Sequence, residues 1–523
     1  MTGHTRPREG EDWLIRTLFA LFLLAGAAVR LWRFGSVPEG LNQDEAFAGY
    51  EAWCLLTTGR DSLGHSLPVY LTAWGSGMNA LESYLMLPFL ALFGRTALAV
   101  RLPQLIVGLL SLPAAYGVGK RAAGRWAGLC GMLLLAVCPW HVMLSRWGLE
   151  SNLAPGFLLF GLYFFLRGME DSHWLLPSAL MYGLALYCYA TLWPFVPLIL
   201  LLQAGYALWC GRLRLRGREG LWTWLSAGVL LALALPLMLF LLVNWGLLPE
   251  LRLGPFTVPR LVVMRGGEFS LSRIPARAAR LLDLLRQQGD GLPWNGTERF
   301  GLFYYGTLPL ALAGLAWAVR EAWEGLSLRQ IRPAALLLIQ LAAGLLQGLT
   351  IDANVNRVNS LWIPVVLLAG LGVWVLCGRL DPRTLAVPLL IYAALFVRFA
   401  GYYFTDYAQE TRSHFGAGLE QAVDAALSRP GEIRVDRGAN YARVLFYSGQ
   451  EPGEYRDTVR YTNYPSPFLD VEGFGRFRFL TGPEEPDRAC VYVVEQGPRA
   501  ETLRDAGFAV ENFDCWAVAY WDG

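Results

Sequence analysis

Long apolar segments recur along the chain up to residue 400, and they constrain its fold more than any other feature. A helix crosses a membrane with about 20 predominantly apolar residues, and eleven segments approach that length. Only 16% of the residues are charged, against about 25% in soluble domains. The sequence therefore predicts an all-α polytopic membrane protein with about 11 transmembrane helices, at residues 13–32, 101–119, 126–139, 153–166, 174–191, 194–210, 222–243, 302–319, 333–350, 360–376 and 385–400.

The distribution of arginines predicts the orientation of these helices. Segment 79–93 is short and contains Glu82 and Pro88, so we expect a re-entrant or interfacial helix there. With this segment excluded, the basic short loops share the side of the N-terminus, where Arg6 and Arg8 lie. We therefore expect a multi-pass protein of the cytoplasmic (plasma) membrane. The positive-inside rule places its N-terminus in the cytoplasm.

The long loop 244–300 is predicted to lie outside despite its eight arginines, because long loops translocate largely regardless of charge. Within it, segment 271–286 places Arg273, Arg277 and Arg280 at helical spacing beside a leucine face. This pattern predicts an amphipathic interfacial helix suited to anionic headgroups.

Beyond residue 402 the chain gains charge and turn residues, and short runs alternate apolar with polar residues. The alternation predicts strands at 432–436, 443–447 and 490–495, and residues 416–427 predict a helix. We therefore expect a transmembrane module at 1–401 and a small C-terminal α/β extracytoplasmic domain at 402–523. Whether Cys490 and Cys515 form a disulfide in that domain stays open.

The predicted topology gathers polar residues on the outer face of the membrane. The carboxylates Asp44 and Glu45 follow the first crossing, and ionised side chains at a membrane boundary indicate a functional site. A carboxylate pair beside arginines suits an anionic, membrane-embedded substrate whose acceptor must lose a proton. The candidates to bind the phosphate and lipid of a donor are Arg101, Arg146, Arg357 and His141, and the candidates to line a substrate pocket are Glu82, Glu150, Asn152, Tyr189 and Asn356.

A transfer reaction outside the cytoplasm has no ATP or nucleotide sugar, so its donor must be activated before it crosses the membrane. A sugar on a polyprenyl phosphate meets this need, because phosphate leaves without the protein acid that a glycosidase supplies to an alkoxide. One carboxylate would then act as base for the acceptor hydroxyl, for about 10²–10⁴ in rate. Arginines would stabilise the departing phosphate, and in-line displacement would invert the anomeric centre.

Each of these residues also has a purely structural interpretation. In this interpretation, Asp44 and Glu45 cap a helix that begins near Asn42. Arg101 extends its charged end to water at the end of a transmembrane helix. Arg146 and Glu150 have the spacing of a helical ion pair. His141 would be an interfacial residue, and the Asn295 sequon would form a turn. The aromatic belt at the membrane boundary would contain Tyr187, Tyr189 and Trp193.

Several motifs, in this order and spacing, resemble a known superfamily. They are Asp44-Glu45, the helix at 77–88, the segment 100–108, Ser145-Arg146 with Glu150-Ser151-Asn152, and the segment 354–359. The chain resembles the GT-C superfamily of integral-membrane glycosyltransferases, in its bacterial branch of the dolichyl-phosphate-mannose protein mannosyltransferase family, related to the lipid A aminoarabinose transferases. The resemblance covers about residues 13–401 and does not reach the C-terminal part.

The resemblance implies a large first outer loop with juxtamembrane helices and a polyprenyl-phosphate sugar donor. It implies Asp44 as the catalytic carboxylate, Glu45 as its partner, and Arg101 on the donor phosphate side. Some relatives use a divalent metal ion, for which Asp44 and Glu82 are the candidate ligands, and others use none. Relatives often carry His-Pro-Pro or Glu-Lys-Pro where Met78-Asn79-Ala80 stands here, so a family-type metal or phosphate contact is in doubt at that point.

The sequence thus favours an inverting glycosyltransferase that moves a sugar to an acceptor hydroxyl on protein, lipid or wall polymer. The alternatives are a transporter or flippase of a lipid-linked or anionic substrate, and a non-enzymatic subunit of cell-envelope assembly. Membrane lipids are the expected surroundings of all three. The net charge of +2 and the lack of a basic block interleaved with aromatic residues exclude a nucleic-acid partner.

Overall fold

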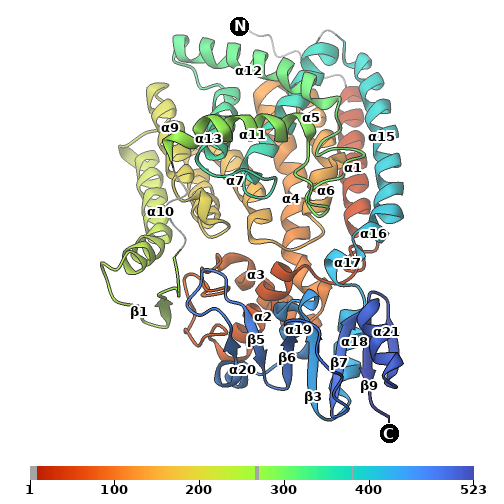
Figure 1. The fold of residues 1–523 in the computed structure, drawn as a ribbon. Helices are drawn as coiled ribbons and strands as arrows, with labels where there is room; N and C mark the ends of the chain where they lie inside the picture. Colours follow the sequence, from red (N-terminus) through yellow and green to blue (C-terminus); the bar gives the residue numbers. More distant parts are fainter. Residues whose placement is uncertain (1–8, 265–269, 380, 523) are drawn as a thin grey trace.

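A bundle of helices stands on a smaller sheet domain, as Figure 1 shows for the computed structural model. The structure describes residues 9–264, 270–379 and 381–522, so Arg6 and Arg8 lie outside it. The helices that precede the sheet domain are α1 (Glu9–Leu31), α2 (Gln43–Thr58), α3 (Leu81–Phe93), α4 (Ala97–Ala123), α5 (Arg125–Val137), α6 (Pro139–Leu144), α7 (Glu150–Gly168), α8 (Leu175–Ala185), α9 (Phe195–Trp209), α10 (Gly217–Asn244), α11 (Ile274–Gln287), α12 (Thr307–Leu328), α13 (Pro333–Thr350), α14 (Trp362–Val373) and α15 (Ala386–Phe404).

The polytopic helical fold that the sequence predicts is confirmed. Within the described ranges, seven helical segments are long and apolar enough to cross a membrane: 11–31, 97–123, 190–209, 217–244, 333–350, 359–378 and 382–410. The other four predicted crossings fall on α5, α7, α8 and α12, so the count of eleven stays a prediction. Helix α3 has 13 residues, fewer than a crossing needs.

One segment, within the long loop 244–300, differs in detail from its prediction. Helix α11 is amphipathic as expected, but its buried Leu281 packs against Gly348 of α13. Its buried Arg277 donates to the Thr350 carbonyl at 2.6 Å and pairs with Asp352 at 3.2 Å. The central arginine of this helix therefore binds the protein rather than lipid headgroups.

The C-terminal domain is built on a seven-stranded mixed sheet of order β4-β5-β6-β3-β7-β9-β8. Strand β3 (Glu432–Asp436) is parallel to both of its neighbours, β6 (Phe477–Leu480) and β7 (Cys490–Glu495). The remaining elements of the domain are α16 (Asp406–Glu410), α17 (Arg412–Phe415), α18 (Leu419–Leu427), α19 (Tyr441–Ser448), α20 (Pro452–Thr458), α21 (Pro498–Asp505), β4 (Arg460–Tyr461), β5 (Val471–Phe474), β8 (Ala509–Phe513) and β9 (Trp516–Tyr520).

The expected strands at 432–436 and 490–495 and the helix within 416–427 are confirmed. The expected strand at 443–447 is wrong, because these residues lie in α19. Asn440 caps that helix by accepting from the Ala442 backbone N–H, and Gly449 ends it in the left-handed conformation. These two caps outweigh the short alternation. Cys490 and Cys515 are both free.

One hydrophobic core joins the segment between α1 and α4 to the sheet domain. Buried residues of α2 and α3, such as Phe47 and Met86, belong to the same cluster as Val435 of β3 and Phe446 of α19. Figure 1 shows α2, α3 and α19 together at the junction of the two parts. The predicted division at residue 401 stays a prediction, and this core crosses it.

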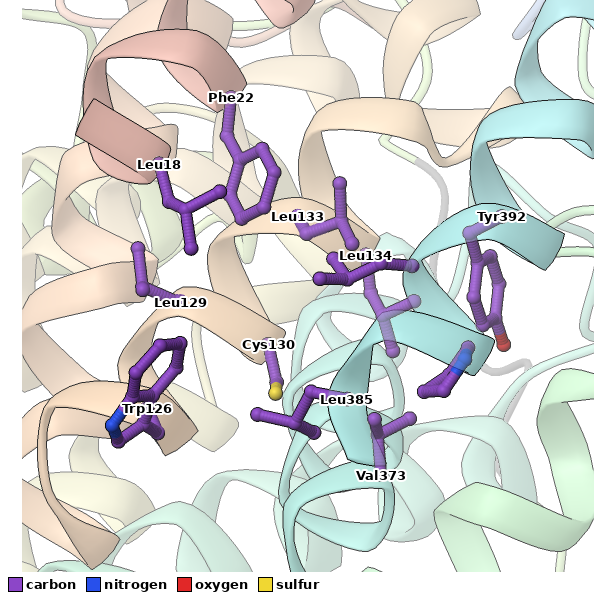
Figure 2. Close-up of a pocket in the computed structure, with 12 residues that line it drawn as sticks. Leu18, Phe22, Trp126, Leu129, Cys130, Leu133, Leu134, Val373, Leu385 and Tyr392 are labelled. Atoms are coloured by element: carbon purple, nitrogen blue, oxygen red, sulfur yellow. The ribbon is translucent and has the colours of Figure 1, made fainter. Parts of the chain in front are cut away.

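A small apolar pocket opens at the other end of the bundle, between α1, α5 and α15. Figure 2 shows Leu18 and Phe22 of α1 facing Cys130 of α5, with Tyr392 of α15 at one side. The only polar side-chain atoms on its labelled walls are a thiol, an indole nitrogen and a phenol, so this pocket offers little chemistry of its own.

Candidate active site

Helix α2 places the Asp44-Glu45 pair in its first turn, at the junction between the bundle and the sheet domain. The Asn42 side chain accepts from the Asp44 backbone N–H at 3.1 Å, and Glu45 Oε2 accepts from the Asn42 N–H at 2.8 Å. This reciprocal arrangement is a capping box, so the capping interpretation is confirmed. The two side chains differ in exposure, since Asp44 is half-buried and Glu45 is fully buried.

Glu45 forms a buried, two-pronged ion pair with Arg101 of α4. Arg101 Nε donates to Glu45 Oε1 at 2.7 Å and Nη2 donates to Oε2 at 3.0 Å. The remaining Arg101 donors reach the carbonyls of Pro38 at 2.8 Å and Gly40 at 2.6 Å. Arg101 has no exposed surface, so it does not snorkel to water. Its hydrogen bonds hold Glu45 and the loop that precedes α2 in place.

His141 and Arg146 belong to a second buried cluster, at the C-terminal end of α1. His141 Nδ1 lies 2.7 Å from Arg30 Nη2, and both side chains are buried. Sequence reasoning missed Arg30, which sits at the end of an apolar run where an arginine ordinarily reaches the interface. The interfacial interpretation of His141 is wrong, because its ring is enclosed.

Arg146 closes the end of α1 rather than pairing with Glu150. Its guanidinium donates to the last carbonyls of the helix and of the following turn, those of Val29, Arg30, Arg33 and Val37. These carbonyls have no partner inside the helix. Arg146 therefore holds the end of α1 in place, and its predicted contact with a donor phosphate stays a prediction.

Glu82, Asn79 and Gln104 form a buried cluster in which three side-chain oxygen atoms lack a hydrogen-bond partner. Gln104 Nε2 donates to Glu82 Oε1 at 3.1 Å and to the Leu149 carbonyl at 3.0 Å. Asn79 Nδ2 donates to Glu150 Oε2 at 3.0 Å. The opposite atoms, Glu82 Oε2, Gln104 Oε1 and Asn79 Oδ1, are buried without a hydrogen-bond partner. All three are acceptors, so the cluster calls for donors such as hydroxyl groups or water.

Gly148 brings this cluster next to the capping carboxylate of α2. Its backbone N–H donates to Glu45 Oε1 at 2.7 Å, and a Cβ atom on it would lie 3.0 Å from Glu82 Oε1. Burial, together with the nearby carboxyl groups of Glu150 and Glu45, raises the pKa of Glu82 well above its usual range. The raised pKa favours the protonated form of Glu82, which makes it a poorer base than an ordinary carboxylate.

Of the other predicted residues, Asn152 lies in the first turn of α7, and Tyr189, Asn356 and Arg357 lie on loops. Asn152 accepts from Asn359 Nδ2 at 3.0 Å, and Trp140 Nε1 donates to Asn359 Oδ1 at 3.2 Å. Asn356 and Arg357 are half-buried in the loop before α14, and Tyr189 is half-buried in the turn after α8. Gln347 joins these two loops, because its Nε2 donates to both Thr191 Oγ1 at 2.6 Å and the Arg357 carbonyl at 2.8 Å.

Asp44 and Glu82 stay predictions as candidate metal ligands. In the described part of the chain, no group of three His, Cys, Asp or Glu side chains is arranged to hold one metal ion. Asp44 and Glu82 alone supply two ligands, fewer than protein sites normally use.

A further carboxylate network, which sequence reasoning missed, lies in the segment between α1 and α4. Buried Glu51 of α2 accepts from the Ser62 backbone N–H at 2.9 Å, and burial together with Asp61 raises its pKa to about 8. Asp61 accepts from Thr72 Oγ1 at 2.9 Å and contacts His65 Nδ1 at 3.1 Å. His65 Nε2 in turn lies 3.3 Å from Glu250, so the network ties this loop to the segment after α10.

Comparison with known proteins bears on the fold and the family. Residues 81–240 match the family described as dolichyl-phosphate-mannose-protein mannosyltransferase. ArnT from Cupriavidus metallidurans in the apo state is similar at 14% identity and a TM-score of 0.53, over 98% of this chain and 98% of that one. ArnT bound to undecaprenyl phosphate is similar at 15% identity and a TM-score of 0.52, over 97% and 98%. No curated protein matches the chain. The chain as a whole thus has the fold of ArnT, and residues 81–240 resemble the dolichyl-phosphate-mannose-protein mannosyltransferase family.

Proposed function

We propose that the chain is an inverting glycosyltransferase that moves a sugar from a polyprenyl phosphate to an acceptor hydroxyl, at the membrane face where α2 lies. The observation that carries this proposal is the half-buried Asp44 in the first turn of α2, beside a carboxylate that is locked away in an ion pair. The family match and the undecaprenyl phosphate bound by ArnT support a lipid-phosphate donor.

Asp44 is the group that would take the acceptor proton. As the acceptor oxygen attacks the anomeric carbon, its proton passes to the Asp44 carboxylate. The bond between that carbon and the phosphate oxygen breaks, and the electron pair leaves on the phosphate. Glu82 is unsuited to this role because its pKa is raised, and Glu45 is unsuited because it already accepts from Arg101, Asn42 and Gly148.

Glu45 and Arg101 act as positioning residues in this proposal. Their ion pair sets the first turn of α2 and therefore the place of Asp44. Arg357 is the best remaining candidate to contact the leaving phosphate, because its side chain is half-buried whereas Arg101 and Arg146 are fully buried. The unpartnered acceptors of Asn79, Glu82 and Gln104 would receive hydroxyl groups of the sugar.

The test is Asp44→Asn in membranes supplied with labelled polyprenyl-phosphate hexose and an envelope fraction as acceptor. Loss of the base should lower transfer about 10²–10⁴-fold while the purified variant keeps its unfolding temperature. Asp283→Asn, at an exposed position on α11, is the control and should transfer normally. Transfer at the normal rate by the Asp44 variant would contradict the proposal, and retained lipid translocation without transfer in the native chain would favour the flippase alternative.

A further inference from the structure

A cavity of about 940 Å³ lies at the end of the bundle opposite α2. It is lined by residues 168–175, after α7, and by residues 210–223, where α10 begins. Helix α7 starts at Glu150 beside the candidate active site and has 19 residues, which carry the chain about 28 Å away. The cavity is therefore on the other membrane face and takes no part in the proposed transfer.

The acidic side chains in this cavity are already paired. Glu170 accepts from Arg121 Nε at 2.7 Å, and Asp171 lies 2.7 Å from His173 Nδ1. The third, Glu219, pairs with Arg214 at 2.8 Å. Arginines thus balance the charges of Glu170 and Glu219, and Asp171 has a hydrogen-bond partner in His173.

Two arginines in the lining are left over. Arg212 and Arg218 are exposed, and within the described ranges neither guanidinium has an ion pair or a hydrogen bond among the side-chain contacts of the structure. Arg218 belongs to the first turn of α10, which has no side-chain cap. The cavity therefore presents two arginines without a carboxylate partner beside the positive end of a 28-residue helix, which together favour an anion.

The surroundings of the cavity are apolar on the side of α9 and α10. Leu208 and Trp209, at the end of α9, are exposed, and so are Leu221, Trp224 and Leu225 of α10. Both helices belong to segments apolar enough to cross a membrane, and tryptophans gather at the membrane–water boundary. An anion that enters this cavity thus lies beside a surface suited to acyl chains.

We propose that this cavity binds the headgroup phosphate of an anionic phospholipid, with Arg212 and Arg218 at the phosphate and the acyl chains along α9 and α10. Basic pockets between transmembrane helices bind anionic lipids in this way. The proposal is independent of the transfer reaction proposed above, because it concerns the opposite face of the bundle.

The test uses the full chain in dodecylmaltoside, with thermal unfolding followed as phosphatidylglycerol is added. We expect the lipid to raise the unfolding temperature with a saturable dependence. Each arginine near an anionic lipid is worth about fivefold in binding, so the double variant Arg212→Gln/Arg218→Gln should require about 30-fold more lipid. Both positions are exposed, and the unfolding temperature without lipid verifies that the variant folds.

The matched control is Arg379→Gln/Arg383→Gln, which removes two exposed arginines that do not line the cavity. This variant should respond to phosphatidylglycerol as the native chain does. An equal loss in both double variants, or no loss in the first, would overturn the proposal in favour of diffuse attraction. Stabilisation by glycerol 3-phosphate at the same headgroup concentration would overturn the assignment to a lipid, and an equal response to phosphatidylcholine would overturn the role of charge.

Discussion

Neutralising Glu45 should damage the fold, whereas neutralising its neighbour Asp44 should not. Glu45 is fully buried and accepts hydrogen bonds from Arg101 at 2.7 and 3.0 Å, from the Gly148 N–H at 2.7 Å and from the Asn42 N–H at 2.8 Å. Asp44 is half-buried and is not part of that ion pair. Two adjacent acids in one helical turn therefore have different physical roles.

The magnitudes follow from these contacts. Glu45→Gln leaves the fully buried charge of Arg101 without its counter-ion, and removing one partner of a buried pair costs about 3–5 kcal/mol. Asp44→Asn preserves the shape of the side chain and replaces one carboxylate oxygen by an amide NH2, and it leaves the ion pair of Arg101 intact, so it should cost about 1 kcal/mol, as a typical single substitution does. The activity should respond in the opposite order, because only Asp44 is proposed to move a proton.

The assay is denaturant unfolding of the purified variants in detergent, combined with the transfer assay on the same preparations. The double variant Glu45→Leu/Arg101→Met supplies the internal control. With both charges removed, no buried charge is left uncompensated, so the double variant should be more stable than Glu45→Gln alone. Equal losses of stability in Glu45→Gln and Asp44→Asn, or a double variant worse than either single one, would refute the reasoning.

Two further predictions concern α2. Burial, and then the charge of Asp61, raises the pKa of Glu51 from its ordinary 4.5 to about 8. Between these two pH values the folded state keeps a proton that the unfolded state loses. The stability of the native chain therefore falls as the pH rises from 4.5 to about 8. Glu51→Gln removes this dependence, and its unfolding temperature should improve relative to the native chain from pH 5 to pH 8; a constant difference would contradict this. A Cβ on Gly49 would lie 2.8 Å from the Phe446 ring, so Gly49→Val should lower the free energy of unfolding, measured with denaturant, by about 1–3 kcal/mol. Gly401 has nothing within 4 Å of such a Cβ, so Gly401→Val should leave that free energy unchanged. Equal losses in the two variants would show that the contact at Gly49 is not tight.

The sequence predicts helices well where an apolar segment is long enough to cross a membrane. The crossing at 333–350 is helix α13 residue for residue, because a long apolar run has no other stable form in a membrane. The segment 443–447 shows the limit, since five alternating residues do not distinguish a half-buried strand from one face of a short helix. There the caps at Asn440 and Gly449 decided the outcome.

The candidate site is predictable in its members but not in their contacts. The residues near positions 44 and 101 are recognisable from motif order, yet the ion pair between Glu45 and Arg101 joins residues 56 positions apart. Arg30 carries no motif, and Gln104 lies in a motif without being singled out. Each acquires its role only when another loop closes over it, at His141 and at Leu149 respectively. A single sequence does not encode such pairings in any local pattern.

The sheet domain and the segment between α1 and α4 share one core, and together they position the candidate site. Helix α2 is held on its bundle side by Arg101, and on its other side Asn440 Nδ2 donates to Gln43 Oε1 at 2.7 Å. The Tyr50 hydroxyl donates to the Gln450 carbonyl at 2.8 Å, which anchors α2 to the turn after α19. Since packed cores resist gradual deformation, α2 cannot shift toward the bundle without also moving α19. The position of Asp44 is therefore set by contacts from both ends of the chain, and a change in the sheet domain at Asn440 alters the site as directly as a change in α4.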